Sequence, residues 1–323
     1  MKGSYEISVQ NNKVKYQFTI RRNITVIQGN SATGKTTLVD LIREYQMNPI
    51  DSGISLSSKK KCSVLEGADW NKQLLLITDS IVFIDEGNAF IASKEFASAI
   101  KNTDNYYVLI TREGLENLPY SVDEIYGIHT SGKYSNLKQV HHEFFHIYNF
   151  TESFDKTTFE RIITEDSNSG FDFFNTISKN KYICESASGK SNIFKMIENS
   201  PLKTLIIADG AAFGSQIDKI LKLTSYKKDC FLFLPESFEY ILLQSELIKD
   251  SEITKILDSP ENFIDSTKYF SWEQFFTKLL IEKAKDSFLQ YKKKNLNKGY
   301  LSENIIQKIL NSEVFAKLKE FFN

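Results

Sequence analysis

A glycine-rich segment near the amino terminus constrains this chain more than any other feature. Residues 29–36 read Gly-Asn-Ser-Ala-Thr-Gly-Lys-Thr and match the pattern G-x-x-x-x-G-K-[ST] of a phosphate-binding loop, or P-loop. A β-branched run at residues 24–28 precedes the loop, and residues 37–42 continue with helical spacing. In such a strand–loop–helix unit, backbone N–H groups and the positive end of the helix face a bound anion. The pattern therefore predicts a nucleotide site.

The polar residues of this loop have separate predicted roles. Lys35 is expected to reach the β- and γ-phosphates, and the Thr36 hydroxyl is expected to ligate the Mg²⁺ that bridges them. ATP and Mg²⁺ are therefore the predicted ligands. The residues expected to surround the nucleotide are Gly29, Asn30, Ser31, Ala32, Thr33, Gly34, Lys35, Thr36 and Thr37.

A second segment supplies the acids that such a loop requires. Residues 81–84 are apolar, as in a buried strand, and Asp85 and Glu86 follow them. Asp85 is expected to hold Mg²⁺, and Glu86 to orient or deprotonate the attacking water. The pair favours hydrolysis of the nucleotide over binding alone.

The next apolar strand, at residues 106–110, ends in Thr111 and Arg112. One interpretation makes one of these residues a sensor of the γ-phosphate, with Arg112 as a catalytic candidate. The alternative is that Arg112 pairs with Glu113 or Glu116 on the surface.

The first half of the chain resembles the P-loop ATPases that have a catalytic glutamate after the Walker B aspartate, the division of ABC-type and AAA-type ATPases. The resemblance covers residues 1–148 and rests on the P-loop, the Asp85-Glu86 pair and the Thr111-Arg112 strand end. It departs from ABC ATPases because no L-S-G-G-Q-like signature is present. His129 is more typical of an incidental histidine than of a switch histidine.

The sequence predicts an α/β protein of more than one domain. A chain of 323 residues, with 41% hydrophobic and 25% charged residues, is long enough for about two globular domains. We expect a P-loop domain at 1–150, a smaller α/β domain at 151–245 and a helical extension at 246–323. In the first domain we expect a hairpin at 5–20, a mostly parallel sheet with strands at 63–65, 80–84 and 106–110, a helix at 94–101 and a late β segment at 137–148. In the second half we expect strands at 161–164, 181–184, 204–208 and 230–234, and helices from about residue 271.

Charge and cysteine content narrow the class of protein. The formal net charge of −1 argues against non-specific coating of nucleic acid. Three cysteines stand far apart without C-x-x-C pairing, which favours reduced thiols. No apolar run approaches the length of a membrane span. We therefore expect a cytoplasmic protein without a membrane partner.

The string His142-Glu143-Phe144-Phe145-His146 matches the zinc-protease pattern H-E-x-x-H. That chemistry requires a helix, in which the two histidines face one metal ion. The β-forming residues around this string predict a strand instead. In a strand the two histidines would lie about 13 Å apart and could not share a zinc ion.

Two interpretations compete in the second half. Residues 184–191 end in Gly-Lys-Ser, as in a second P-loop, but Cys184 replaces its first glycine. The other interpretation uses acids at strand ends. Glu165 follows the strand at 161–164, and Asp209 follows the strand at 204–208, 44 residues later.

This second pattern resembles the Toprim domain of OLD-family nucleases, over about residues 158–245. The resemblance implies that Glu165 and Asp209 hold Mg²⁺, with Glu236 or Glu239 in the late acidic segment. It departs from the D-x-D motif because Ala211 occupies the second aspartate position. The alternative is that these acids are merely solvated.

The sequence thus predicts an ATPase that controls a Toprim-like, nucleic-acid-directed domain, a nuclease or a component of antiviral defence. The other hypothesis is a nucleotide-dependent interaction switch with a catalytically inactive Toprim-like platform. The expected partners are ATP, a nucleic acid, and another protein or a second copy of the chain. The lysines at 292–294 are interpreted either as a contact to a phosphate backbone or as a solvated helix end.

Overall fold

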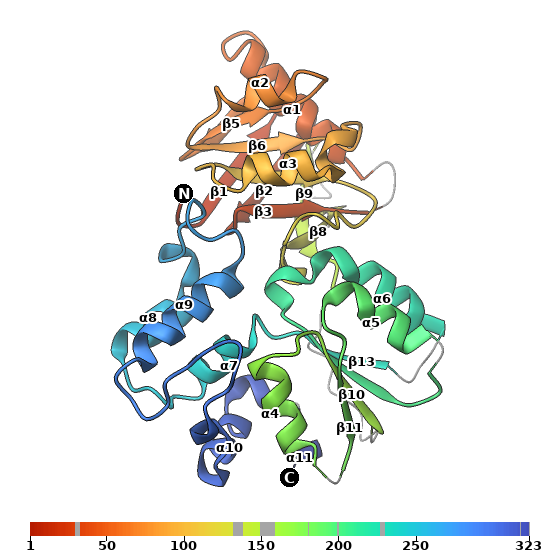
Figure 1. Cartoon of the computed structure of the whole chain (residues 1–323). Coiled ribbons are helices and arrows are strands. Elements are labelled where there is room, and N and C mark those ends of the chain that lie inside the picture. Colours follow the sequence, from red (N-terminus) through yellow and green to blue (C-terminus); the bar gives the residue numbers. More distant parts are fainter. Residues whose placement is uncertain are drawn as a thin grey trace. The chain divides into compact units, whose positions relative to one another are not determined.

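The computed structural model describes residues 1–29, 33–131, 138–148, 159–179, 181–198, 200–226, 230–316 and 318–322. The fold is mixed α/β (Figure 1). It divides into two compact units, with residues 1–148 and 259–270 in unit 1 and residues 149–258 and 271–323 in unit 2. The expected boundary between the first two domains, at residues 150–151, lies outside the described residues, as do Asn30, Ser31, Ala32 and Leu137.

Unit 1 contains a mixed sheet of nine strands within the described residues, in the order β4-β1-β2-β9-β8-β3-β7-β6-β5. The strands from β8 to β5 are parallel, β9 is antiparallel to β8, and β1 pairs with both β2 and β4 in antiparallel fashion. Strand β7 separates β3 from β6. The bounds are β1 Tyr5–Gln10, β2 Val14–Ile20, β3 Ile24–Ile27, β4 Ser55–Ser58, β5 Lys61–Val64, β6 Ser80–Ile84, β7 Tyr106–Ile110, β8 Ile125–Thr130 and β9 Val140–His146.

Helices cover both faces of this sheet. The helices of unit 1 are α1 Lys35–Met47, α2 Trp70–Leu74 and α3 Lys94–Ile100. In β7, Tyr106 joins the buried cluster that contains Leu38 of α1, whereas the next residue, Tyr107, packs edge-on against Phe96 of α3 with ring centroids 6.0 Å apart. Because successive strand residues point to opposite faces, α1 and α3 lie on opposite sides of the sheet. The three-layer arrangement predicted for this half is confirmed.

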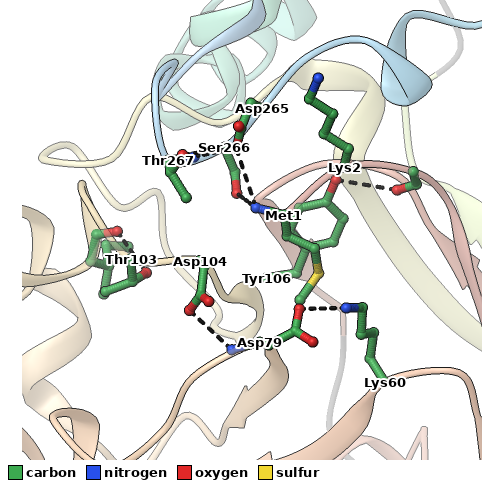
Figure 2. A network of polar contacts seen from close by, with 12 residues as sticks. Met1, Lys2, Lys60, Asp79, Thr103, Asp104, Tyr106, Asp265, Ser266 and Thr267 are labelled. Atoms are coloured by element: carbon green, nitrogen blue, oxygen red, sulfur yellow. Dashed lines mark hydrogen bonds and ion pairs between the residues drawn. The ribbon is translucent and has the colours of Figure 1, made fainter.

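A segment from late in the sequence belongs to unit 1. Residues 259–270 lie against the first residues of the chain, where the Ser266 N–H donates to the Met1 carbonyl at 3.0 Å and the Gly3 N–H donates to the Glu261 carbonyl at 2.7 Å. The Met1 nitrogen donates to the Ser266 hydroxyl at 2.9 Å (Figure 2). The chain therefore passes between the units at 148–149, 258–259 and 270–271.

Unit 2 is built on a parallel sheet of four strands, as far as this unit is described, in the order β11-β10-β12-β13. The strands are β10 Arg161–Thr164, β11 Ile183–Ser186, β12 Thr204–Ile207 and β13 Cys230–Phe233. Strands β10 and β12 are buried and apolar, as central strands of a parallel sheet are. Strand β11 begins two residues later than the strand expected at 181–184.

The helices of unit 2 include those expected from residue 271 onward. They are α4 Ser169–Ile177, α5 Lys190–Glu198, α6 Gly214–Tyr226, α7 Phe238–Gln244, α8 Ser251–Asp258, α9 Trp272–Ala284, α10 Glu303–Leu310 and α11 Lys319–Phe322. Phe315, near the end of the chain, is fully buried and lies 5.6 Å from Phe233 of β13 and 5.9 Å from Phe174 of α4, between ring centroids. Residues 246–258 and 271–323 thus belong to the same compact unit as the four-stranded sheet, whereas the sequence analysis set residues 246–323 apart as an extension.

Candidate functional site

The P-loop residues that the structure describes connect a buried strand to a helix. All four residues of β3 are buried, and α1 begins at Lys35. Gly29 and Gly34 have φ values of +130° and +92°, a region that residues with a Cβ atom rarely adopt. The Lys35 ammonium donates to the Gly29 carbonyl at 2.9 Å and contacts the Thr33 hydroxyl at 3.2 Å. The lysine therefore contacts the residues on either side of 30–32.

Four charged residues meet beside this loop. Burial lowers the pKa of Lys35, Glu86 and Asp85 oppose that shift, and Arg112 adds to it. These interactions place the charged residues that follow β6 and β7 near Lys35. The predicted set of Lys35, Asp85, Glu86 and Arg112 is therefore gathered at one place.

Glu86 is held by the residue from the neighbouring strand end. Arg112 donates from Nε to Oε2 of Glu86 at 2.9 Å and from Nη2 to Oε1 at 2.7 Å. These hydrogen bonds lower the pKa of Glu86 below its usual value. Arg112 thus pairs with Glu86, the predicted catalytic glutamate. The alternative prediction was a surface pair with Glu113 or Glu116.

Thr36, Thr37 and Thr111 differ in their availability to a ligand. Thr36 and Thr37, in the first turn of α1, are exposed. Thr111 is buried, and its hydroxyl donates to the Glu113 carbonyl at 2.9 Å while accepting from the Glu113 N–H at 3.1 Å. The Thr111 hydroxyl is therefore engaged in a local turn. Arg112 instead extends to Glu86 at the end of the neighbouring strand.

Tyr16 contacts Gly34 of the P-loop, although no sequence motif predicts it as a site residue. Its hydroxyl donates to the Gly34 carbonyl at 2.8 Å, and burial raises its pKa to about 12. A Cβ atom placed on Gly34 would lie 2.6 Å from this hydroxyl. The alternation of β2 predicts that Tyr16 faces inward, but the sequence does not give its register against the loop.

The H-E-x-x-H string lies in strand β9, as predicted. The His142 ring stacks on Tyr16, with centroids 4.6 Å apart and the planes inclined by 14°, whereas His146 packs against Tyr126. The two histidines thus have different neighbours. In the part of the chain that the structure describes, no group of three or more His, Cys, Asp and Glu side chains is placed to hold a metal ion.

The acids predicted in the second half are close together in unit 2. Glu165 follows β10 and Asp209 follows β12, and these strands are adjacent and parallel. Because β11 lies on the other side of β10, the chain reverses its direction of winding between β10 and β12. The carboxyl ends of strands at such a reversal form the usual ligand crevice of an open α/β sheet. The Asp209 N–H donates to Oε2 of Glu165 at 3.1 Å.

Two further acids surround this pair. Burial raises the pKa of Asp209, and the charges of Glu273, Glu239 and Glu165 raise it further. Burial likewise raises the pKa of Glu165. Glu239 lies in α7 and was one of two predicted alternatives, whereas Glu273 lies in α9 and was not predicted. We call Glu165, Asp209, Glu239 and Glu273 the carboxylate centre.

The carboxylate centre does not have the geometry of a metal site. A cavity of about 20 Å³, lined by Glu165, Asp166 and Asp209 together with apolar side chains, has room for about one water molecule. Oδ1 of Asp209 accepts from the Phe238 N–H at 3.2 Å, and Oε2 of Glu165 accepts from Asp209. With these oxygens turned toward backbone donors, the residues as placed do not fit Mg²⁺.

The Gly-Lys-Ser segment of unit 2 is built differently from the P-loop. Cys184, the residue in place of the first glycine, lies in β11. The Lys190 ammonium donates to the Ala212 carbonyl at 3.0 Å and contacts the Ser215 hydroxyl at 3.3 Å. The lysine thus interacts with residues at the start of α6. The segment borders the carboxylate centre, because the Gly189 N–H donates to the Glu165 carbonyl at 2.7 Å.

The fold is that of a mixed α/β protein, in which the predicted P-loop residues lie in unit 1 and the carboxylate centre lies in unit 2. No known family model matches the chain, and no curated protein is significantly similar to it. None of the helices described here is long and apolar enough to span a bilayer.

Proposed function

We propose that unit 1 binds and hydrolyses ATP. The observation that supports this proposal most strongly is the position of Lys35, which begins α1 and interacts electrostatically with the acids after β6. The strand order is consistent with it, because β7 lies between β3 and β6 as in the ATPases with an added central strand. The resemblance of residues 1–148 to that division rests on these same elements.

The phosphate chain would lie in the loop from Gly29 to Thr37. In the free protein Lys35 donates to the Gly29 carbonyl, and a bound triphosphate would offer its ammonium a stronger, charged acceptor. Mg²⁺ would neutralise charge on the phosphates. The exposed Thr36 hydroxyl and the Asp85 carboxylate are the residues that would hold it.

Glu86 is the proposed general base and Arg112 the proposed γ-phosphate sensor. The two hydrogen bonds from Arg112 keep Glu86 ionised, which a base requires, but they also occupy both of its carboxylate oxygens. A γ-phosphate would attract Arg112 and free the carboxylate to orient water. The ion pair would thus couple arrival of the nucleotide to release of the base.

We propose that unit 2 is the output of this ATPase. The resemblance to Toprim domains suggests a nucleic-acid-directed activity, nuclease or antiviral. The second candidate is an interaction platform that binds a partner protein or a second copy without catalysis. The geometry of the carboxylate centre favours this second candidate, because its oxygens accept from backbone N–H groups. Mg²⁺-dependent cleavage of DNA or RNA that Asp209→Ala abolishes would reject the platform, and absence of cleavage would reject the nuclease.

The test of ATP binding compares two lysines, each of which begins a helix of unit 1. Lys35 begins α1 and Lys94 begins α3. Lys35→Met should abolish the rise in melting temperature that Mg-ATP produces, and Lys94→Met should retain it. Equal stabilisation of both variants by Mg-ATP would refute the proposed role of the P-loop.

A further inference from the structure

The turn at residues 291–293, after α9, is bonded through its backbone to the start of α4. The Ser169 hydroxyl, at the start of α4, donates to the carbonyls of Lys292 and Lys293 at 2.8 Å each, and the Ser169 N–H donates to the Lys293 carbonyl at 3.1 Å. Ser169 is fully buried. Because the hydroxyl proton is shared between the two carbonyls and the N–H adds a second donor, the backbone of Lys293 is held next to the start of α4.

This turn supplies two side chains to the carboxylate centre. The buried Tyr291 hydroxyl donates to Oε1 of Glu239 at 2.8 Å. The Lys293 ammonium forms an ion pair with Glu273, and the two side chains are 34% and 21% exposed, so both are half-buried. Lys292, the residue between them, is exposed. The turn thus directs a neutral donor and a cation inward and leaves the intervening lysine in solvent.

The electrostatics of Lys293 extend beyond Glu273. Burial alone would lower the pKa of Lys293, but the carboxylates of Glu239, Glu273 and Asp209 raise it above its usual value. The ammonium therefore stays charged. Conversely, Lys293 opposes the increase in the pKa of Asp209. Lys293 thus interacts with three of the four acids of the centre, and Lys190 interacts with the fourth, Glu165.

Buried carboxylates require a counter-charge, which a metal ion or a basic side chain can supply. We infer that Lys293 is the built-in counter-cation of the carboxylate centre and occupies the electrostatic role of a divalent ion there. Mg²⁺ would have to replace the ammonium and turn the carboxylate oxygens away from their backbone donors before it could bind there. The inference concerns unit 2 alone and stands whether or not unit 1 hydrolyses ATP.

The inference predicts a change in metal response when the lysine is removed. In the nucleotide-free full-length protein, Lys293→Met should lower the melting temperature by roughly 5 °C or more, because it leaves buried carboxylates without their cation. Millimolar Mg²⁺ should restore much of this loss. Wild type and the matched control Lys292→Met should share a smaller response to Mg²⁺, and any contribution from the P-loop is common to all three proteins.

A second variant covers the case in which Lys293→Met does not fold. The double variant Glu273→Gln/Lys293→Met removes one charge of each sign and should be more stable than Lys293→Met alone. The inference is overturned if Lys293→Met melts like wild type, if Mg²⁺ fails to restore its stability, or if the double variant is no more stable. It is also overturned if Mg²⁺ stabilises wild type and Asp209→Asn removes that stabilisation, because the metal site would then be open beside Lys293.

Discussion

Arg112 binds Glu86 through two hydrogen bonds, of 2.9 Å from Nε and 2.7 Å from Nη2, and so connects the ends of two adjacent strands of unit 1. Glu86 is the residue proposed to activate water, and Lys35 interacts electrostatically with both partners. The structure therefore holds the proposed base in an ion pair. A nucleotide that draws Arg112 away would change the partner of Glu86.

Removal of Arg112 should affect turnover far more than folding. The guanidinium side chain is 59% exposed, and exposed ion pairs contribute little to stability. Arg112→Met should leave the melting temperature nearly unchanged and lower kcat for ATP by roughly tenfold or more, because a cation at the γ-phosphate is lost. The control is Arg43→Met. Arg43 lies in α1, about two turns after Lys35, and the substitution breaks its ion pair with Glu66. Equal turnover in both variants would contradict the proposed role of Arg112.

Gly34 should tolerate no side chain. Its φ of +92° penalises any residue with a Cβ atom by roughly 1–2 kcal/mol, and that atom would lie 2.6 Å from the Tyr16 hydroxyl. Gly34→Ala should therefore lower the free energy of unfolding measured with urea and weaken ATP binding. Adding Tyr16→Phe to this variant should recover part of the stability, because the clash is relieved and the backbone strain remains.

Gly29→Ala is the matched control for this effect. Gly29 also has a positive φ, of +130°, but among the described residues, its chain neighbours aside, no atom lies within 4 Å of the position of its Cβ. Tyr16→Phe in the Gly29→Ala background should therefore give no recovery. The explanation fails if Tyr16→Phe has the same effect in both backgrounds.

Glu124 should make unit 1 less stable as the pH rises. Burial raises its pKa from an ordinary 4.5 to about 7, although Arg22 and Thr25 oppose the shift. Because the folded protein holds this proton more tightly than the unfolded chain, the stabilisation is complete below pH 4.5 and is lost as the pH rises through 7. The change amounts to roughly 3 kcal/mol.

Urea unfolding at several pH values tests this prediction. The free energy of unfolding of wild type relative to Glu124→Gln should fall between pH 4.5 and pH 8, since glutamine does not titrate. Asp123→Asn, at the exposed neighbouring position, should keep the pH dependence of wild type. A constant difference between wild type and Glu124→Gln at all pH values would rule out Glu124 as the titrating group.

The sequence predicts the strands that have strong local patterns. The hairpin of β1 and β2 follows from alternating residues around a turn, and β6, β7 and β10 follow from short apolar runs. The sequence does not predict strand β4, because Ser55–Ser58 is serine-rich and its pairing with β1, at the edge of the described sheet, is a tertiary contact. Strand β8 was missed because Gly127 interrupts its apolar pattern.

The site residues divide in the same way. Lys35, Asp85 and Glu86 belong to contiguous motifs, so their types and spacing could be read directly. The position of Tyr16 depends on the register of β2 against the loop. The positions of Glu273 and Lys293 depend on how α9 and the turn after it pack against the sheet of unit 2. No local sequence pattern encodes either relationship. The lysines at 292–294 were interpreted as a phosphate contact or a solvated helix end, whereas Lys293 pairs with Glu273.

Hydrolysis of ATP by Glu86 is the central claim, and phosphate release by Glu86→Gln tests it most directly. Glutamine keeps the size of the side chain but cannot accept a proton from water. Wild type should release phosphate from Mg-ATP. Glu86→Gln should bind ATP with a similar Kd, but its rate of phosphate release should be about one hundredth of the wild-type rate or lower. Phosphate release by Glu86→Gln at the wild-type rate, or none by wild type, would contradict the account.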